Sequence, residues 1–118
     1  MSILVTGGDG YIGWPTALRI ADRTDDRVVI VDNFARREWV ENVGATSAVP
    51  IAGIDGRIAA AEEVHGLGNL SFVEGDLVER SFVDELLGVH EPDVVVHAAA
   101  QPSAPYSQIN GERANYTQ

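Results

Sequence analysis

The sequence contains neither cysteine nor lysine. Without cysteine, the chain has no disulfide scaffold, no thiol nucleophile and no thiolate ligand for a metal ion. Without lysine, it has no ammonium side chain to act as a base or to form a Schiff base. Its eight cationic side chains are therefore all arginines, against 18 aspartates and glutamates. Such a surface suits high salt, which screens self-repulsion, and would follow equally from a genome that favours arginine codons.

Long apolar runs and clusters of positive charge are absent as well. No apolar stretch approaches the roughly 20 residues that a helix needs to span a bilayer, so no membrane contact is expected. The net charge of −10 argues against nucleic acid as a partner, because phosphate groups would be repelled. Met1 and Ser2 lead straight into apolar residues 3–5 with no basic region, unlike a signal peptide. We therefore expect a cytoplasmic protein.

The apolar residues that are present suffice for one folded domain. The 118 residues are 45% hydrophobic, which excludes a disordered tail and provides a core without disulfides or metal. Continuous apolar runs are typical of strands buried on both faces of a parallel sheet. Such runs predict strands at 3–6, 28–31 and 93–97, and the alternation of apolar and polar residues predicts a further strand at 70–73.

Helical spacing separates these predicted strands. Residues 11–22 predict a helix with Pro15 tolerated near its first turn. Its expected inward residues are Ile12, Ala17, Leu18 and Ile20. Residues 33–68 look like a long irregular connection that contains a short helix at 57–62. The alternation of strand and helix predicts a doubly wound, Rossmann-like α/β fold with a parallel sheet.

The last predicted helix follows the third strand. Ser81 is its expected N-cap, with Asp84 as the capping-box partner three residues on. Its buried face is predicted to contain Phe82, Leu86 and Val89. Gly88 and residues 91–92 are expected to stop it.

The sharpest functional signal is the glycine-rich turn between the first strand and the first helix. Gly7, Gly10 and Gly13 form G-x-x-G-x-x-G, and Gly8 adds the overlapping G-x-G-x-x-G. After a strand and before a helix, this turn is typical of a pyrophosphate site, where Gly10 permits close backbone approach and the helix N-terminus supplies amides. Glycines that serve only the turn are the alternative. The predicted cofactor contacts here are Gly7, Gly8, Gly10, Tyr11, Ile12 and Gly13.

An acidic residue stands where the second predicted strand ends. Asp32 lies 19 residues after Gly13, where a carboxylate accepts hydrogen bonds from ribose hydroxyls and repels a 2′-phosphate. This position favours NAD over NADP. Arg36 and Arg37 could instead pair with a 2′-phosphate, or form a solvated face. We give Asp32 more weight and predict contacts to NAD from Asp32, Asn33 and Arg36.

The carboxyl ends of the third and fourth predicted strands carry further candidates. Asp76 can accept a hydrogen bond from an adenine amino group while Leu77 packs on the base, although Asp76 could also cap the next helix. His97 closes the fourth strand and is more often structural than catalytic in such a place, and no metal site is predicted. The small residues after it, predicted to lie against the cofactor, are Ala98, Ala99 and Ala100.

Together these motifs resemble the extended short-chain dehydrogenase/reductases, which are NAD-dependent nucleotide-sugar epimerases and dehydratases. The matching pieces are Thr6-Gly7-Gly8-x-Gly10-x-x-Gly13, Val31-Asp32-Asn33, Gly75-Asp76-Leu77 and His97-x-Ala99-Ala100. Other stretches are similar to one branch of that family, the UDP-sulfoquinovose synthases. They are residues 7–14 with 31–37, residues 50–58, and the block 103–107 with 116–118.

The resemblance to that branch implies a reaction and a set of partners. Its members hold NAD and bind UDP-glucose, which is oxidised at C4, loses water across C5–C6, gains sulfite at C6 and is reduced again at C4. The product supplies sulfolipid head groups or surface glycans. By the same resemblance, Gln101, Ser103 and Tyr106 are expected to contact the substrate, and the full-length enzyme is expected to be a homodimer.

The chain departs from the family pattern in two places. Pro102 stands where the plant enzymes carry an arginine, and the Tyr-x-x-x-Lys pair used in catalysis is absent because the chain has no lysine. We interpret residues 1–118 as the N-terminal, NAD-binding part of a longer enzyme: four strands of an incomplete sheet, without catalytic residues and inactive alone. The alternatives are a UDP-glucose 4-epimerase, a nucleotide-sugar 4,6-dehydratase and a non-catalytic NAD-binding module.

Overall fold

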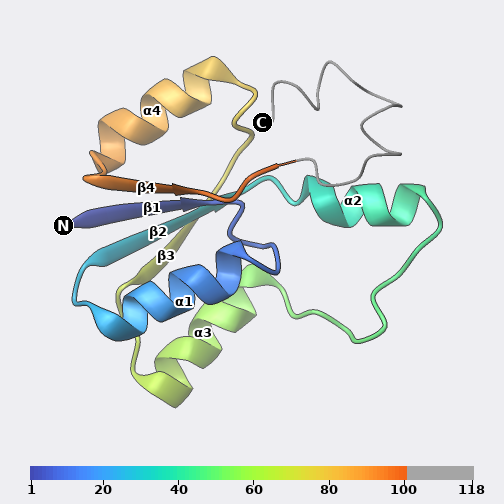
Figure 1. The fold of residues 1–118 in the computed structure, drawn as a ribbon, viewed down its shortest axis with the longest axis horizontal. Helices are drawn as coiled ribbons and strands as arrows, with labels where there is room; N and C mark the ends of the chain where they lie inside the picture. The colour runs from blue at the N-terminus through green and yellow to red at the C-terminus, as the bar shows by residue number, and fades with distance from the viewer. Residues whose placement is uncertain (101–118) are drawn as a thin grey trace.

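The computed structural model describes residues 1–100, so the predictions made for Gln101, Ser103 and Tyr106 lie outside the described residues. Strands and helices alternate along this part of the chain (Figure 1). In chain order they are β1 (Ser2–Thr6), α1 (Gly13–Arg23), β2 (Arg27–Asp32), α2 (Ala35–Asn42), α3 (Ile54–His65), β3 (Leu70–Glu74), α4 (Arg80–His90) and β4 (Val94–His97).

The four strands form one parallel sheet in the order β3-β2-β1-β4. β1 lies inside the sheet, where Leu4 pairs with Val29 on one side and Val95 on the other. Since every residue of β1 is buried, its continuous apolar run is explained by contacts on both faces. The predicted doubly wound, Rossmann-like α/β fold is therefore confirmed.

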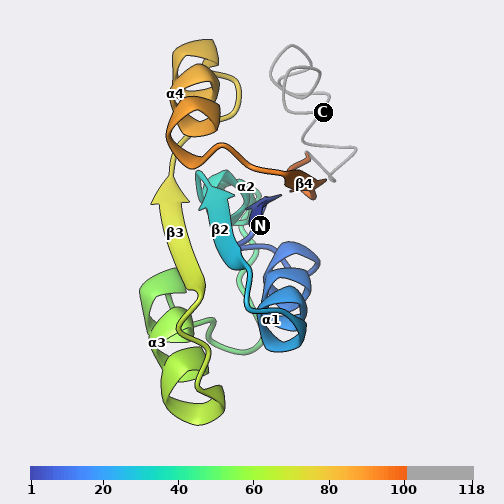
Figure 2. The ribbon, with the colours of Figure 1, turned by 90° about the vertical axis from the view of Figure 1, so that its left-hand side faces the viewer.

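Helices cover both faces of the sheet. α1 and α3 lie on one face and α4 lies on the other, as Figures 1 and 2 show. Alternate residues of a strand point to opposite faces. Ile3 and Ile30 accordingly belong to the core beneath α1, whereas Leu4 and Val29 pack with Leu86 of α4.

The sheet order places a change of direction between β1 and β4. From β1 the chain moves outward to β2 and β3, and α4 then returns it across the sheet to β4 on the other side of β1. In open α/β sheets, ligands bind at such a switch point, beyond the carboxyl ends of the strands. The fold therefore directs attention to the loops that follow β1 and β4.

α1 packs closely on the sheet because small residues face it. Ala17 and Ala21 are both almost completely buried, and Pro15 occupies the third helical position, where its missing amide breaks no intrahelical bond. The expectation that Ile12 points inward is wrong, since Ile12 is 56% exposed. It precedes the helix as its N-cap, so the helical periodicity does not apply to it.

The region between β2 and β3 is more helical than predicted. Residues 33–68 contain α2, which the sequence did not indicate, and α3, which extends well beyond the expected 57–62. α2 buries only Ala35, so it has no apolar stripe to detect. α3 ends where Gly66 adopts a left-handed conformation with φ of 69°, a common helix stop.

The start predicted for α4 is also wrong, whereas of its two predicted stop signals residues 91–92 are confirmed, since Glu91 is the C-cap, and Gly88 is not. The helix begins at Arg80 with Glu79 as its N-cap, so Ser81 is already helical and makes no capping bond. Gly88 lies inside the helix, which continues to His90. Leu86 is buried as expected, whereas Val89 is 66% exposed. No helix within residues 1–100 is both long and apolar enough to cross a membrane.

Candidate functional site

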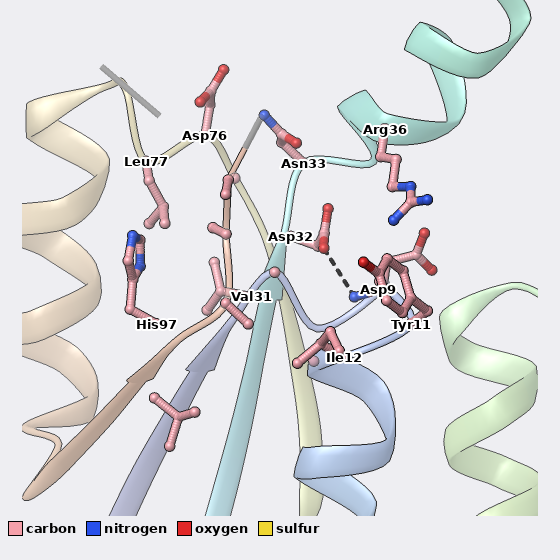
Figure 3. Close-up of a pocket in the computed structure, with 18 of the residues that line it drawn as sticks. Asp9, Tyr11, Ile12, Val31, Asp32, Asn33, Arg36, Asp76, Leu77 and His97 are labelled. Atoms are coloured by element: carbon pink, nitrogen blue, oxygen red, sulfur yellow. Dashed lines mark hydrogen bonds between the residues drawn. The ribbon is translucent and has the colours of Figure 1, made fainter. Parts of the chain in front are cut away.

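A pocket of about 400 Å³ lies at the carboxyl edge of the sheet. Its size is in the range of small-molecule sites. Segments from separate loops line it (Figure 3), namely residues 9–13, 31–33, 75–78 and 96–100, with Gly7, Arg36 and Trp39. Every predicted cofactor contact except Gly8 is in this lining. Gly8 lies instead against the core, where an added Cβ would meet Cγ2 of Ile30.

The glycine loop connects three strands at the base of the pocket. The Gly7 amide donates to the Val31 carbonyl of β2 at 2.8 Å. Gly7 has a φ of +72°, and a Cβ there would lie 2.6 Å from backbone atoms of Ala98 and Ala99, just beyond β4. A Cβ on Gly13 would lie 2.1 Å from the Gly7 carbonyl oxygen, so only glycine lets the start of α1 approach the loop.

The N-terminus of α1 has backbone amides that donate no hydrogen bond to any other described residue. The Gly10 and Trp14 amides donate hydrogen bonds to carbonyls of the loop. The amides of Tyr11, Ile12 and Gly13 donate to no acceptor within residues 1–100. The first turn carries no acidic residue and the N-cap makes no side-chain hydrogen bond. The positive end of the helix dipole is thus available to an anion in the pocket.

Asp32 closes β2 and faces the same pocket (Figure 3). Its Oδ2 accepts from the Asp9 amide at 2.9 Å and its Oδ1 from the Phe34 amide at 2.8 Å. Phe34 has a left-handed φ of 58°, which turns the chain sharply into α2. Each carboxylate oxygen can accept a second hydrogen bond, so Asp32 is fixed in place and still able to receive two hydroxyl donors.

A buried carboxylate inside the glycine loop binds two arginines from distant helices. The Asp9 side chain is 8% exposed, and its Oδ2 and Oδ1 accept from Arg37 Nε at 2.7 Å and Nη2 at 2.8 Å. Arg57 donates to the same Oδ1 from α3. Hydrogen bonding to Asp9 raises the pKa of Arg37, whereas burial lowers the pKa of Arg57 despite the attraction of Asp9.

Aromatic rings hold two of the nearby guanidinium groups. Arg57 lies 4.7 Å from the centroid of the Trp14 ring, and Arg36 lies 4.8 Å from that of Tyr11. Cation–π contact favours both arrangements. Arg36 lines the pocket and forms no ion pair with another residue of the described range.

The opposite side of the pocket comes from β4 and from the turn before α4. Asp76 Oδ1 accepts from the Val78 amide at 3.1 Å, which forms a turn ahead of α4, while Leu77 lines the pocket and packs on the core. His97 Nδ1 lies 2.8 Å from Thr6 Oγ1. Residues 1–100 contain no group of three or more His, Cys, Asp or Glu that could hold a metal.

Sequence reasoning missed several lining residues. Trp39 lies on the helix that was not predicted, and Val96 and Val78 carry no recognisable binding signal. Asp9 occupies an unspecified position between the glycines of the motif, so the motif does not indicate it as a functional residue. Its partners Arg37 and Arg57 are 28 and 48 residues away, so only the folded chain brings them together.

Comparison with known proteins adds to this geometry. The model of the NAD dependent epimerase/dehydratase family matches residues 3–117. The UDP-sulfoquinovose synthase of Sulfolobus acidocaldarius is 40% identical over 117 residues, which are 99% of this chain and 29% of that protein. The chloroplastic UDP-sulfoquinovose synthase of Spinacia oleracea is 43% identical over 116 residues, which are 98% of this chain and 24% of that protein.

A solved structure is similar over the same range. It is a UDP-glucose-4-epimerase from Stenotrophomonas maltophila with bound NAD and formylated UDP-arabinopyranose, with a TM-score of 0.70 and 26% identity. The match covers 99% of this chain and 30% of that one. The chain thus spans less than a third of the length of the curated relatives and of the solved protein.

Proposed function

The chain belongs to the NAD dependent epimerase/dehydratase family, and from this membership we propose that it is the cofactor-binding part of an enzyme that modifies a nucleotide sugar. The observation that carries the proposal is the set of amides at the start of α1, next to Gly10, that donate to no acceptor within residues 1–100, in a first turn that holds no acidic residue. A pyrophosphate is the ligand that such a helix terminus suits.

The residues of the pocket fit NAD. The amides of Tyr11, Ile12 and Gly13 would hold the pyrophosphate, with Gly10 leaving room for its approach. Asp32 would accept hydrogen bonds from the adenosine ribose. The remaining predicted contacts would surround the adenine and the nicotinamide half; they are Gly7, Asn33, Arg36, Asp76, Leu77, Ala98, Ala99 and Ala100.

When bound, NAD supplies a reversible acceptor for a hydride from the sugar. The residues of this chain bind the cofactor, orient it and neutralise its phosphates, and we assign no catalytic side chain to them. The absence of lysine means that the family's catalytic pair would have to come from elsewhere in a longer protein. Residues 1–118 alone are therefore expected to bind NAD without turnover.

For the complete enzyme we propose the conversion of UDP-glucose and sulfite to UDP-sulfoquinovose and water. The two synthases that match almost the whole chain at 40% and 43% identity support this assignment. Gln101, Ser103 and Tyr106 are proposed to contact the substrate, and the full-length enzyme is proposed to be a homodimer.

The test is to incubate the complete gene product with UDP-glucose, with and without sulfite, and to identify the products by mass spectrometry. A sulfonated sugar nucleotide that forms only with sulfite is the expected result. The purified protein should also release NAD on denaturation, or bind it in calorimetry. A protein that carries no NAD and binds none would contradict the proposed cofactor role.

The second candidate is a UDP-glucose 4-epimerase, because the fold matches an epimerase of that kind with a TM-score of 0.70. The same incubation separates the two candidates. Formation of UDP-galactose alone, regardless of sulfite, would favour the epimerase and exclude the synthase assignment.

A further inference from the structure

Three of the eight arginines of this acidic chain gather around the glycine loop and the end of β2. Arg36 and Arg37 come from α2, and Arg57 comes from α3. Guanidinium groups beside a ribose site are the groups that recognise a 2′-phosphate. The local composition therefore conflicts with Asp32, which disfavours such a phosphate.

The Asp9 carboxylate resolves this conflict. It occupies both Nε and Nη2 of Arg37, the edge of the guanidinium that a phosphate would otherwise bind in bidentate fashion. Nη2 of Arg37 also reaches the Ala52 carbonyl at 3.3 Å. Arg57 is engaged by the same carboxylate and by the Trp14 ring. Both arginines are thus committed to protein partners.

Asp9 is also tied directly to the ribose-binding carboxylate. Its backbone amide donates to Asp32 at 2.9 Å, and Figure 3 shows the two residues side by side in the pocket. The hydrogen bonds that Arg37 donates to the Asp9 carboxylate raise the pKa of Arg37, and the charge of Asp32 adds to the effect. Because Asp9 is bonded to Asp32 through its amide and to Arg37 through its carboxylate, Arg37 lies close to the site where a 2′-phosphate would sit.

We propose that Asp9 is a second determinant of dinucleotide selectivity, which excludes NADP by keeping Arg37 and Arg57 bound to itself. The inference rests on the proposed function, because it requires the adenosine ribose to lie at Asp32. Removal of the Asp9 charge frees the Arg37 guanidinium to bind a phosphate near that ribose through two hydrogen bonds. It also makes the net charge of the pocket more positive by one unit. Asp9 is a positioning residue here, since it acts through Arg37.

The test measures the affinities of the complete gene product for NAD and NADP, and for their adenosine halves, 5′-AMP and adenosine 2′,5′-bisphosphate, by calorimetry after removal of bound nucleotide. Asp9→Asn keeps the shape of the side chain and removes its charge. Asp84→Asn is the matched control, because it changes the net charge equally at an exposed pair with Arg80 on α4. Circular dichroism confirms that each variant is folded.

We expect Asp9→Asn to lower the ratio of the NADP and NAD dissociation constants about tenfold to a hundredfold, the value of a hydrogen bond to a charged group. Asp84→Asn should leave that ratio unchanged. In the double variant Asp9→Asn/Arg37→Gln the gain should disappear. A folded Asp9→Asn protein that binds NAD with unchanged discrimination against NADP would overturn the proposal.

Two further outcomes are informative. If neither the unmodified protein nor Asp84→Asn binds NAD, the proposed function itself fails, which is distinct from a failure at Asp9. If Asp9→Asn does not fold, the Arg37→Gln variant tests the proposal instead. Because Asp9 already holds the Arg37 guanidinium, Arg37→Gln should weaken the binding of adenosine 2′,5′-bisphosphate by less than about threefold, which is well below the effect of losing one hydrogen bond. A loss of about tenfold would show that Arg37 reaches the phosphate without release and would refute the proposal.

Discussion

Replacement of single glycines by alanine should separate the packing role of the glycine loop from its binding role. At Gly13 a Cβ would lie 2.1 Å from the Gly7 carbonyl oxygen and 2.8 Å from Gly8 Cα, whereas real Cβ contacts under 3.0 Å are essentially unknown. Backbone would have to move by about 1 Å, because no flexible side chain can give way. Overpacking of this kind costs about 1–3 kcal/mol.

Gly10 presents the opposite case. A Cβ there would meet only the Gly7 carbonyl oxygen, at 3.3 Å, so the expected change in the free energy of unfolding is within about 0.5 kcal/mol. The added methyl group would instead keep a pyrophosphate from the backbone. Loss of one charge-assisted hydrogen bond weakens NAD binding by about tenfold or more.

Gly88 provides the matched control, because it lies within α4, two residues before its end, where an added Cβ meets nothing within 4 Å. Gly88→Ala should raise the free energy of unfolding by about 0.5–1 kcal/mol and leave NAD binding intact. Urea unfolding and calorimetry on the three variants give both quantities. Equal stability of Gly13→Ala and the unmodified protein, or unchanged NAD affinity in Gly10→Ala, would refute the division of roles.

Other substitutions test the ribose site and the core. Asp32→Ala should weaken NAD binding by about tenfold to a hundredfold in calorimetry, since it removes a charged acceptor; unchanged affinity would contradict its assignment to the ribose. Asn69→Ala should lower the free energy of unfolding, measured in urea, by about 1–3 kcal/mol. The reason is that Asn69 Nδ2 donates to the carbonyl oxygens of Ala21, Thr24 and Asp26. Leu86→Ala should lower the free energy of unfolding by about 2–5 kcal/mol, because Leu86 is buried. Leu87 is 42% exposed, so Leu87→Ala should lower it by about 1 kcal/mol or less.

The sequence allowed the sheet and the edge that holds the pocket to be predicted, because the signals for both are local. The runs at 3–5 and 28–31 are apolar without interruption, and such short runs rich in β-branched residues are typical of strands covered on both faces. The glycine spacing then indicates where the chain must turn tightly into a helix. Parallel strands end at one edge, so residues after each strand could be grouped without a structure.

Helices without a buried stripe could not be predicted in this way. α2 buries only Ala35, and its start is connected to the rest of the fold through the bonds of Arg37 to Asp9 and through Phe34, its N-cap, which packs against the core. Residue spacing carries no signal for a helix of this kind. The start of α4 differs from the prediction for another reason: Ser81 and Asp84 match a capping box, yet the N-cap is Glu79, two residues earlier.

The position of Asp9 shows why a motif of glycines describes only half of this loop. Its amide donates to Asp32 and its carboxylate accepts from Arg37 and Arg57, so one residue positions the proposed acceptor for the ribose and two nearby arginines. The glycines make close backbone approach possible, which is a local requirement and is visible in the sequence. The charge distribution depends instead on helices 28 and 48 residues away. A residue written as x in the motif can therefore decide which dinucleotide the site prefers, once the fold has supplied its partners.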